Sequence, residues 1–431
     1  LFSVLMFFSV LILTACSDAV FASQPLELTL DEIVITGDPI LDTISNNSIG
    51  KKIIEQGKNI NVADVLKLGA EVDIKRTAAA GDTGDIISIH GLSRNRIMLN
   101  VNGRPLTASG IVGGYYIDWS GIPLDDIEKI EIIKGGSSAL YGNNAIGGAV
   151  NIITRKPKSG RPKTTLYAMG AKNEADGAND NFKIGHSGKN GRLGYSLAVS
   201  RRKSPEFLWN NDFTGKNGSI FLYYDMPRGA KLSFGGQYSN TRRGFIRNNR
   251  RSLDCDNPLF NSKINEDYPL SLGETISGSG INNIANIGPG AYWDKDKYLY
   301  DLTYNQPFRN GYFEIKHYRN KEDRKEKNFS TADGHLVLDR VVESDRSFGS
   351  SVQVVKIDGR NETTFGAERK IIANGDITVN FVDNVYNGRI YTGTTPNNEG
   401  LNQNFYIQNV SRINDRLSVT AGLRRYDYII G

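Results

Sequence analysis

The residue types that most often catalyse reactions or ligate metals are sparse and scattered in this sequence. Its four histidines, His90, His186, His317 and His335, lie far apart and none belongs to an H-E-x-x-H motif. The glycines at 135–136 and 142–148 lack the spacing of a phosphate-binding loop and are typical of turns instead. We therefore expect no enzymatic activity, no metal centre and no cofactor.

Three further groups of residues have open interpretations. Asp254 and Asp256, next to Asn257, form either a calcium-binding loop or an ordinary solvated acidic pair. The basic runs 201–203, 242–243 and 250–251 either steer an anionic ligand, or contact phosphate groups, or are solvated surface residues. The two cysteines, Cys16 and Cys255, form no disulfide if Cys16 is cleaved off or acylated.

Composition narrows the class of protein. The 431 residues carry a net charge of +5, which is spread too thinly to predict a nucleic-acid partner. A hydrophobic content of 39% and a mean hydropathy of −0.38 exclude a protein with several membrane-spanning helices. A membrane β-barrel passes this test, because its polar lumen-facing residues lower the average. The 46 glycines suit many turns.

The first residues predict export. Leu1 to Leu13 has the length of a signal-peptide core, and Val20-Phe21-Ala22 provides a cleavage site before Ser23. The competing interpretation is a lipoprotein box at 13–16 with an acylated Cys16. Because the sequence does not begin with Met and stops at Gly431 directly after an alternating run, we expect a chain cut at both ends.

Residues 51–157 predict a compact α/β domain. A short helix is expected over 62–68, and strands over 86–89, 97–101, 127–134 and 150–154, with a sharp reversal at Asn102-Gly103. Pro157 marks its end. The polar segment 23–50 that precedes it is expected to be extended and mobile, with one β-prone island over 31–36.

Residues 158–431 predict repeated antiparallel hairpins. Apolar and polar residues alternate over 193–199 and 417–423, and about eleven strands reach the roughly 9–11 residues that cross a bilayer. Tight turns at 189–191, 227–229, 309–311 and 358–360 are expected to alternate with long polar connections at 242–295, 320–347 and 372–401. This alternation is typical of an outer-membrane β-barrel.

Four motifs in the α/β stretch carry a resemblance to a known family. They are Ile89 to Arg96 (IHGLSRNR), Asn102 to Pro105 (NGRP), Ile127 to Gly135 (IEKIEIIKG) and Ser138 to Thr154 (SALYGNNAIGGAVNIIT). Together they resemble the plug domain of TonB-dependent outer-membrane receptors, collinearly over about a hundred residues. The resemblance implies a mostly β fold, with an α/β plug inside a partial, C-terminally truncated antiparallel transmembrane β-barrel of the 22-stranded type. The implied order is a signal peptide over 1–22, a mobile segment with the TonB box over 23–50, the plug over 51–157 and the barrel over 158–431.

The same resemblance implies the positions of three sites. The TonB box corresponds to Asp31, Glu32, Ile33, Val34, Ile35 and Thr36. Apical plug loops that face the ligand correspond to 77–84 and 106–119, with candidate contacts at Thr77, Asp82, Arg94, Ser109, Tyr115, Tyr116 and Trp119. The aromatic residues either stack on the ligand or pack the plug against the barrel.

Plug–barrel anchoring is expected at His90 and Lys134, where the family usually carries arginine. With an ordinary pKa near 6.5, a neutral His90 predicts anchoring that is weaker or depends on pH. The alternative for His90 is a buried histidine with satisfied hydrogen bonds.

The resemblance implies TonB-dependent active transport of a metal chelate, a siderophore or a cobalamin-like ligand, across the outer membrane of a Gram-negative bacterium. The expected partners are TonB, the chelate, outer-membrane lipid and lipopolysaccharide. An outer membrane has no ion gradient or nucleotide of its own, so a β-prone segment that pairs with a periplasmic protein would supply the work. The alternatives are a non-transporting fragment of such a receptor and, more distantly, a secreted β-rich adhesin.

Overall fold

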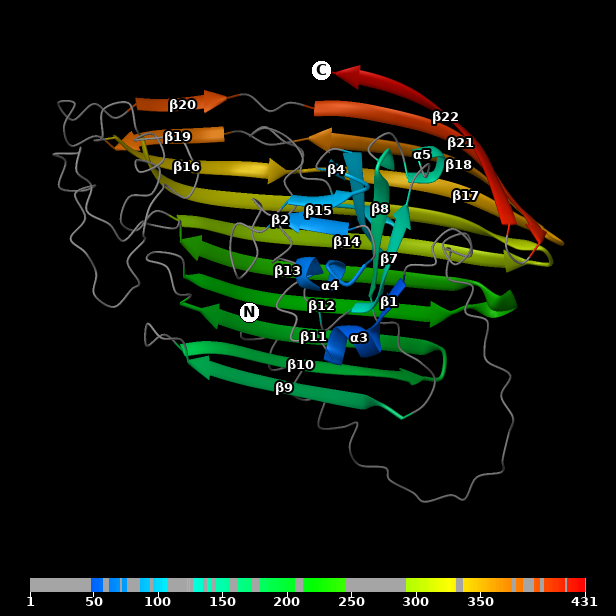
Figure 1. The fold of residues 1–431 in the computed structure, drawn as a ribbon, viewed down its shortest axis with the longest axis horizontal. Coiled ribbons are helices and arrows are strands. Elements are labelled where there is room, and N and C mark those ends of the chain that lie inside the picture. The colour runs from blue at the N-terminus through cyan, green and yellow to red at the C-terminus, as the bar shows by residue number, and fades with distance from the viewer. Residues whose placement is uncertain are drawn as a thin grey trace. The chain divides into compact units, whose positions relative to one another are not determined.

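The structure is a computed structural model that describes residues 48–56, 62–69, 72–75, 86–93, 96–106, 122, 124, 127–134, 138–141, 145–154, 161–172, 178–205, 212–244, 292–330, 336–373, 377–382, 391–395, 399–414 and 417–430. These residues belong to one compact unit that spans 37–431. They form a small α/β unit and a large antiparallel sheet, here called the wall (Figure 1). None of the helices within the described residues has the length and apolar character needed to span a membrane.

The α/β unit is built on a five-stranded sheet with the order β1-β7-β8-β5-β6. Its strands are β1 (Ser48–Gly50), β5 (Ile97–Val101), β6 (Arg104–Pro105), β7 (Ile127–Lys134) and β8 (Gly148–Thr154). A second sheet contains β2 (Val72–Lys75), β3 (Ile86–Ile89) and β4 (Leu92–Ser93), and the helices are α3 (Lys51–Gln56), α4 (Val62–Leu66) and α5 (Ser138–Tyr141). Because β1 pairs with β7, its residues belong to the α/β unit and not to the mobile segment expected over 23–50.

The core of the α/β unit forms on both faces of β7 and β8: one face carries the larger apolar cluster, and the other carries Ile133 and Ala149 of a smaller one beside the buried Glu131. Ile130 and Ile132 of β7 and Val150 and Ile152 of β8 are fully buried. Helix α4 covers this sheet with the apolar residues that its sequence repeats, including Val62 and Leu66. The predicted helix and the strands over 86–89, 97–101, 127–134 and 150–154 are therefore confirmed.

The wall is a 14-stranded sheet with one continuous path of eleven strands, as the alternation predicted. In path order these are β9 (Lys163–Lys172), β10 (Ala178–Asn190), β11 (Leu193–Ser204), β12 (Phe213–Asp225), β13 (Lys231–Gly244), β14 (Tyr292–Phe308), β15 (Gly311–Ser330), β17 (Phe348–Asp358), β18 (Asn361–Ala373), β21 (Glu399–Asn414) and β22 (Leu417–Ile430). Among the described strands, β9 and β22 end the path and do not pair with each other, as expected for an unclosed barrel.

Two of the three expected long connections contain additional strands. Strand β15 continues to Ser330 and pairs with β16 (Leu336–Asp345), which pairs with β19 (Ile377–Val382) and then β20 (Tyr391–Thr395). The prediction of polar loops at 320–347 and 372–401 is therefore wrong for these segments, because their backbones pair into the same hydrogen-bonded ladder. The end of the wall at which β15, β16, β19 and β20 extend the sheet is here called the long-connection end, and the opposite end is called the short-turn end. At the latter, turns follow Asn190, Asp225, Phe308 and Asp358.

The outer face of the wall, which points away from the α/β unit, is apolar. The side chains of Leu423, Leu166, Phe405 and Val199 are between 56% and 77% exposed. Tyrosines border this apolar band near the long-connection end, where the rings of Tyr238 and Tyr298 lie 5.0 Å apart. Beyond them the outer face carries ion pairs such as Lys321 with Asp323.

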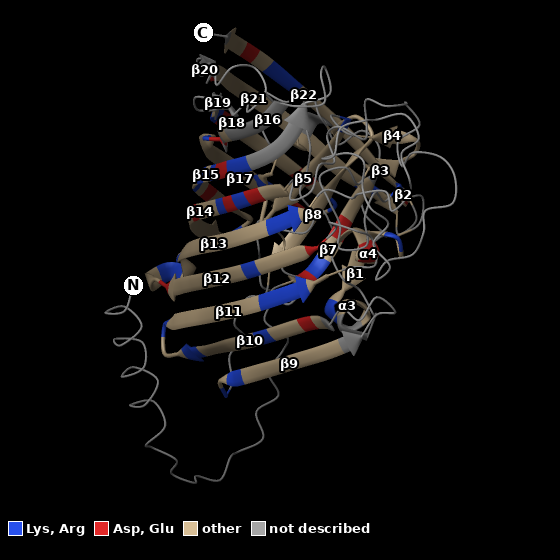
Figure 2. Cartoon of the chain, turned by 90° about the vertical axis from the view of Figure 1, so that its left-hand side faces the viewer, with Lys and Arg blue, Asp and Glu red and all other residues tan. Residues whose placement is uncertain are grey.

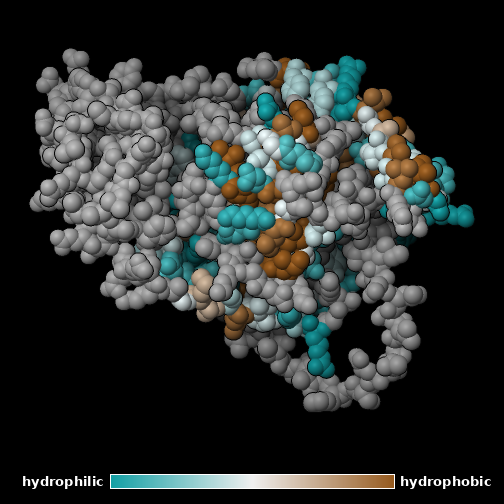
Figure 3. Space-filling model, viewed as in Figure 1, coloured by the Kyte–Doolittle hydropathy of each residue, from teal (hydrophilic) through white to brown (hydrophobic). Residues whose placement is uncertain are grey.

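Charged residues gather toward the strand ends (Figure 2). The basic runs 201–203 and 242–243 lie on β11 and β13 near the long-connection end, visible as blue bands. Seen from the side of the α/β unit, apolar and polar surface patches alternate (Figure 3). Ile53, Leu68 and Ile146 of the α/β unit are among its exposed apolar side chains.

Candidate functional site

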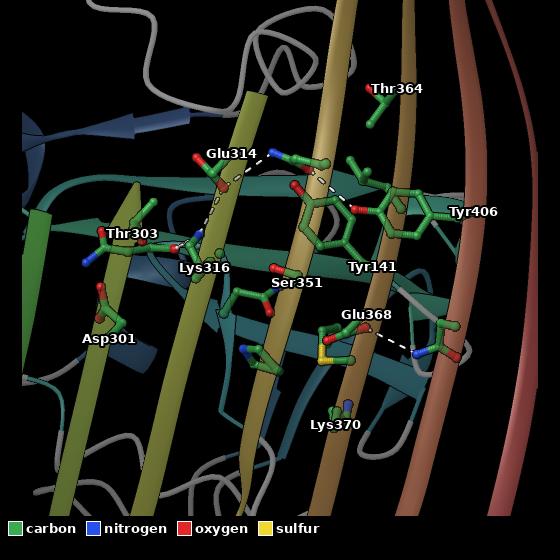
Figure 4. A pocket seen from close by; sticks show the side chains of 18 of the residues that line it. Tyr141, Asp301, Thr303, Glu314, Lys316, Ser351, Thr364, Glu368, Lys370 and Tyr406 are labelled. Atoms are coloured by element: carbon green, nitrogen blue, oxygen red, sulfur yellow. Dashed lines mark hydrogen bonds and ion pairs between the residues drawn. The ribbon is translucent and has the colours of Figure 1, made fainter. Parts of the chain in front are cut away.

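A polar cavity of about 170 Å³ lies between the α/β unit and the wall. The α/β unit contributes the β5–β6 hairpin, α5 and β8, while the wall contributes inward-facing residues from β12 to β22 (Figure 4). Several lining residues, including Tyr312, Val355 and Thr364, lie within a few residues of the short turns. The cavity therefore occupies the short-turn half of the wall.

The hairpin that joins β5 to β6 is shaped by its Asn-Gly turn. Asn102 and Gly103 both have positive φ, 52° and 72°, which is the requirement of a tight two-residue hairpin and the reason for this pair of residues. Asn102 Nδ2 donates to Thr154 Oγ1 at 2.8 Å, and Thr154 N donates back to Asn102 Oδ1 at 3.0 Å. The predicted reversal is confirmed, and these bonds fix it on β8.

The residue after this turn, Arg104, makes a buried ion pair with the wall. Its Nη1 donates to Asp301 Oδ1 of β14 at 2.8 Å, with both side chains less than a tenth exposed. Burial lowers the pKa of Arg104, and the carboxylate of Asp301 opposes that shift. A buried pair of this kind leaves an uncompensated charge when one partner is removed, so it holds the α/β unit firmly to β14.

A glycine on the neighbouring strand makes room for this pair. Gly235 of β13 lies opposite Asp301 in the ladder. A Cβ atom at this position would lie 2.6 Å from Asp301 Oδ1, which is closer than van der Waals contact allows. The glycine therefore lets the carboxylate lie flat against the wall.

Two neutral carbonyls of the same hairpin are also bound by the wall. Lys316 Nζ of β15 donates to Asn102 O at 2.9 Å, and Asn320 Nδ2 donates to Pro105 O at 3.2 Å. Leu299 of β14, 2% exposed, belongs to the apolar core of the α/β unit. We call this set of interactions, together with the Arg104–Asp301 pair, the hairpin contact.

A buried carboxyl, Asp345 at the end of β16, lies close to the hairpin contact. It accepts a 2.8 Å hydrogen bond from Ser347 N, and Asn320 Nδ2 donates to Ser347 Oγ at 3.3 Å. Burial raises the pKa of Asp345 to about 6, against the lowering effect of its bonds to Ser347. Its ladder partner, Glu322, lies next to the Lys321–Asp323 ion pair, so Asp345 lies beyond the apolar band.

A second contact joins α5 to the far side of the wall, where α5 packs on β21 and β22. Arg424 Nη1 of β22 donates to Leu140 O at 2.9 Å, while its Nη2 binds Glu368 Oε2 at 2.6 Å. The guanidinium also lies 5.0 Å from the ring centroid of Tyr406 and 5.2 Å from that of Tyr426. We call the docking of α5 through Arg424 the α5 contact.

Between the two contacts the wall lines the cavity with a hydrogen-bonded chain (Figure 4). Lys316 Nζ lies 3.6 Å from Glu314 Oε1, Gln353 Nε2 donates to the same oxygen at 3.4 Å, and Tyr406 OH donates to Gln353 Oε1 at 3.4 Å. Within the described part of the chain, buried polar atoms of the cavity-lining residues Asn100, Thr364, Asn402 and Asn404 have no hydrogen-bond partner. Such atoms are normally satisfied by water, which the cavity has room to hold.

The charged groups of this site bind one another across the interface. Its charges are already paired within the site, as Arg104 with Asp301 and Arg424 with Glu368. In the described ranges, no three His, Cys, Asp or Glu residues come close enough together to hold a metal ion. The arrangement fastens one domain to another around a hydrated space.

Most residues implicated by the sequence lie outside the described residues. These are the TonB box, the calcium candidates Asp254 and Asp256, and the ligand candidates Thr77, Asp82, Arg94, Ser109, Tyr115, Tyr116 and Trp119. His90 is described: it lies in the β3–β4 turn with a φ of 51° and an exposed side chain, so the buried alternative is wrong. Lys134 ends β7, where its backbone pairs with Gly148. An anchoring role for His90 and Lys134 stays a prediction.

The residues that the structure brings together at this interface were not singled out from the sequence. Arg104 belongs to a recognised motif, but its wall partner lies 197 residues further along the chain. Strand alternation does place Asp301, Glu314, Glu368 and Arg424 on the face opposite the apolar band. Charged residues on that inner face, in strands long enough to cross a membrane, are the sequence feature that could have indicated this interface.

Comparison with known proteins agrees with this architecture. Residues 40–149 match the family model of the TonB-dependent receptor plug domain. The vitamin B12 transporter BtuB of Vibrio vulnificus is 29% identical over 326 residues, which cover 65% of this chain and 52% of that protein. The chain thus spans about half the length of this curated relative.

Solved structures share the fold at low sequence identity. The ferric yersiniabactin uptake receptor FyuA of Yersinia pestis superposes with a TM-score of 0.63 at 14% identity, covering 89% of this chain and 60% of that one. The unliganded ferric citrate transporter FecA gives 0.66 at 14%, covering 89% and 56%. The siderophore receptor PirA of Acinetobacter baumannii gives 0.62 at 18%, covering 89% and 56%.

The α/β unit is therefore a plug domain, and the wall is a part of the barrel that surrounds it in such proteins. Residues 40–149 thus match the plug domain of TonB-dependent receptors, as the motifs indicated, and the chain is similar to members of that family.

Proposed function

We propose that this protein transports a metal chelate, a siderophore or a cobalamin-like ligand, across the outer membrane of a Gram-negative bacterium, with energy supplied through TonB. The observation that carries the proposal is the polar interface described above. A plug is fastened by the buried Arg104–Asp301 ion pair, and by the hydrogen bond from Arg424 to Leu140 O, to the inner face of a sheet whose outer face is apolar. A passive pore needs no plug, and a water-soluble adhesin has no use for an apolar outer face.

The dimensions of the wall support a membrane location. On β14 the outward apolar residues run from Tyr298 to Phe308, a rise of roughly 33 Å along the strand. At the inclination of about 40° common in outer-membrane barrels, this corresponds to roughly 25 Å along the membrane normal, the height of their apolar band. By the usual pattern of such barrels, the short-turn end faces the periplasm and the long-connection end faces outward, toward lipopolysaccharide.

The energy for uptake would reach the plug through its N-terminal segment. Asp31 to Thr36 is β-prone and precedes β1, the strand at one edge of the plug sheet. A β-prone segment of this kind can add to the sheet of a periplasmic partner, here TonB, by strand pairing. A pull on it would act first on β1.

The ligand would be held by the apical plug loops. Thr77, Asp82, Arg94, Ser109, Tyr115, Tyr116 and Trp119 are the proposed contacts. A cobalamin-like ligand is supported by the relative that is named a vitamin B12 transporter, and a siderophore by the fold neighbours named as siderophore or ferric-chelate receptors. Trp119→Ala is expected to weaken ligand binding about tenfold, while Tyr224→Ala on the outer face of the wall leaves it unchanged.

The decisive experiment measures uptake of labelled cobalamin and of labelled ferric siderophores. The complete gene is expressed in a Gram-negative host that lacks its own receptors, with and without TonB. We expect TonB-dependent accumulation of one ligand class. Ile33→Pro should reduce uptake at least tenfold without changing ligand binding, because proline cannot donate to a strand ladder, whereas Ile35→Val should have little effect. Accumulation that is equal without TonB would contradict the proposal.

A further inference from the structure

We propose that the short-turn end of the wall binds the phosphate groups of anionic glycerophospholipids, such as phosphatidylglycerol, in the membrane leaflet that surrounds this end. The inference rests on the membrane location in the proposed function, but it does not depend on which chelate the receptor transports. It follows from the charges of the short turns and from their distance to the apolar band.

The short turns of the wall carry an excess of positive charge. We call them together the short-turn rim, which consists of residues 189–193, 225–231, 308–311 and 356–361. Its two carboxylates are Asp225 and Asp358, whereas its seven basic residues are Lys189, Arg192, Arg228, Lys231, Arg309, Lys356 and Arg360. Each turn has at least one basic residue, and Figure 1 shows the four turns at the same, right-hand end of the wall. The sheet therefore gathers these charges along one edge.

The carboxylates of the rim do not neutralise it. Asp225 lies between two lysines, with its carboxylate 2.9 Å from Lys189 Nζ and 3.6 Å from Lys231 Nζ. Within the described part of the chain, no ion pair is made by the four exposed side chains of Arg192, Arg228, Arg309 and Lys356. The charges of these four residues are therefore available to a ligand from outside the chain.

The rim begins where the apolar band ends. Arg309 directly follows Phe308, whose side chain is 45% exposed on the outer face. Lys356 lies two residues beyond Val354 on the same face of β17, and thus about 7 Å further along the strand. The headgroup layer of a bilayer occupies roughly 5–7 Å on each side of the hydrocarbon core, so lipid phosphates lie at the level of these cations. Long basic side chains reach this layer while their stems stay on apolar surface.

The backbone at Arg228 supports a role for its side chain outside the fold. Arg228 has a φ of 60° and a ψ of 25°, in the left-handed region that glycine and asparagine adopt at lower cost. Its carbonyl accepts a 3.2 Å hydrogen bond from Gln306 Nε2, but this bond does not need an arginine side chain. The turn thus carries an exposed cation at a position where a smaller residue would be more stable.

The chemistry of the rim selects among lipids by their net charge. A guanidinium offers paired N–H donors to two phosphate oxygens, and an ammonium offers a compact charge. The phosphate of phosphatidylglycerol has no counter-charge in its own headgroup, whereas those of phosphatidylethanolamine and phosphatidylcholine are neutralised by an ammonium group. We therefore expect the rim to prefer phosphatidylglycerol over both zwitterionic lipids.

The test compares three forms of the complete receptor in phosphatidylcholine vesicles. They are the parent, a rim variant (Arg192→Gln, Arg228→Asn, Arg309→Gln, Lys356→Gln) and a charge-keeping control (Arg192→Lys, Arg228→Lys, Arg309→Lys, Lys356→Arg). Spin-labelled phosphatidylglycerol and phosphatidylcholine report the relative association of each lipid with the protein. We expect a preference for phosphatidylglycerol of about threefold or more in the parent and the control, and below about 1.5-fold in the rim variant. The preference of the parent should disappear in about 1 M salt.

Three results would overturn the inference. The first is an equal preference in the parent and the rim variant, and the second is a loss of preference in the charge-keeping control. The third is a rim variant that no longer sediments with purified peptidoglycan but keeps the lipid preference, because the anionic partner would then be the cell wall. Arg228→Asn alone should leave the midpoint of thermal unfolding unchanged or higher, which separates lipid binding from stability.

The outcomes also separate this inference from the proposed function. A receptor that does not insert into vesicles contradicts both. A receptor that takes up a chelate with TonB but shows no preference for phosphatidylglycerol overturns the rim alone. A receptor that shows the preference but takes up neither cobalamin nor a ferric siderophore contradicts the transport function and supports the rim.

Discussion

The plug and the wall put apolar strand residues in opposite places. In the plug, Ile132 and Val150 are fully buried in a dry core. In the wall, Leu423 and Phe405 point outward and are 77% and 59% exposed, while polar residues such as Gln408 and Asn404 are buried at the inner face. The comparison shows that the plug folds as a soluble domain does, whereas the wall requires an apolar solvent on its outside and a polar partner on its inside.

The largest effect is expected from a charge in the plug core. Ile132→Asp places a carboxylate among fully buried apolar residues, which should cost more than about 4 kcal/mol and prevent stable folding of the plug. Limited proteolysis of the receptor in its membrane measures this as rapid cleavage of the plug. A plug that remained protected would contradict the dry core, and Ile53→Asp at an exposed plug position is the matched control.

The next largest effect concerns the buried ion pair between the two regions. Asp301→Ala leaves the charge of Arg104 buried without its partner and should weaken plug docking by about 3–5 kcal/mol. The double variant Arg104→Met with Asp301→Leu should restore most of this loss, because it removes both charges. Urea-induced exposure of the plug measures docking. A single variant as stable as the parent would show that the pair does not fasten the plug.

The outer face of the wall gives a third test. Leu423→Arg should destabilise the wall by about 2–4 kcal/mol in a bilayer, because the side chain lies on the exposed apolar face that the proposed function places against lipid. The control, Asp427→Arg, lies four residues further along the same face, next to Arg425 and closer to the strand end. Reversible unfolding in lipid vesicles measures the difference. A cost below about 0.5 kcal/mol would mean that water, and not lipid, covers this face.

Packing beside the ion pair should give a smaller effect. Gly235→Ala would place a Cβ atom 2.6 Å from Asp301 Oδ1 and force the carboxylate to shift. We expect a loss of about 1–3 kcal/mol in plug docking, measured by the same urea titration as above. Gly218→Ala on β12 has open space around its Cβ position and should be nearly neutral.

The smallest effect is a pH dependence at Asp345. Its folded-state pKa of about 6 is higher than the ordinary value of 3.8, so the folded protein binds this proton more tightly. Its contribution to stability is therefore fully present below about pH 4 and is lost as the pH rises through about 6, a difference of about 1 kcal/mol between pH 5 and pH 7. Comparing the parent with Asp345→Asn over this range isolates the group. An identical pH dependence of the two would contradict the raised pKa.

The sequence predicted those features that depend on local chemistry. The Asn102-Gly103 turn follows from its two residue types, and the outer face of β22 from the alternation of Leu417, Val419 and Leu423. The strand extension over β16 and β19 was missed, because these segments were interpreted from their position inside long polar connections, although Ile377, Val379 and Phe381 alternate with polar residues in β19. The partner of Arg104 could not be found either, since alternation shows that Asp301 faces inward but not which part of the plug it meets.

Strand parity gives the wall a counting rule for insertions and deletions. In β14 the anchoring carboxylate of Asp301 and the outward Leu302 are neighbours in sequence and occupy opposite faces. One inserted residue between Leu302 and the turn after Phe308, with the turn held in place, would send the acid into lipid and the leucine toward the plug. Two inserted residues would restore both orientations. Related wall strands are therefore expected to differ in length by even numbers of residues, with odd differences absorbed by bulges or placed in the loops.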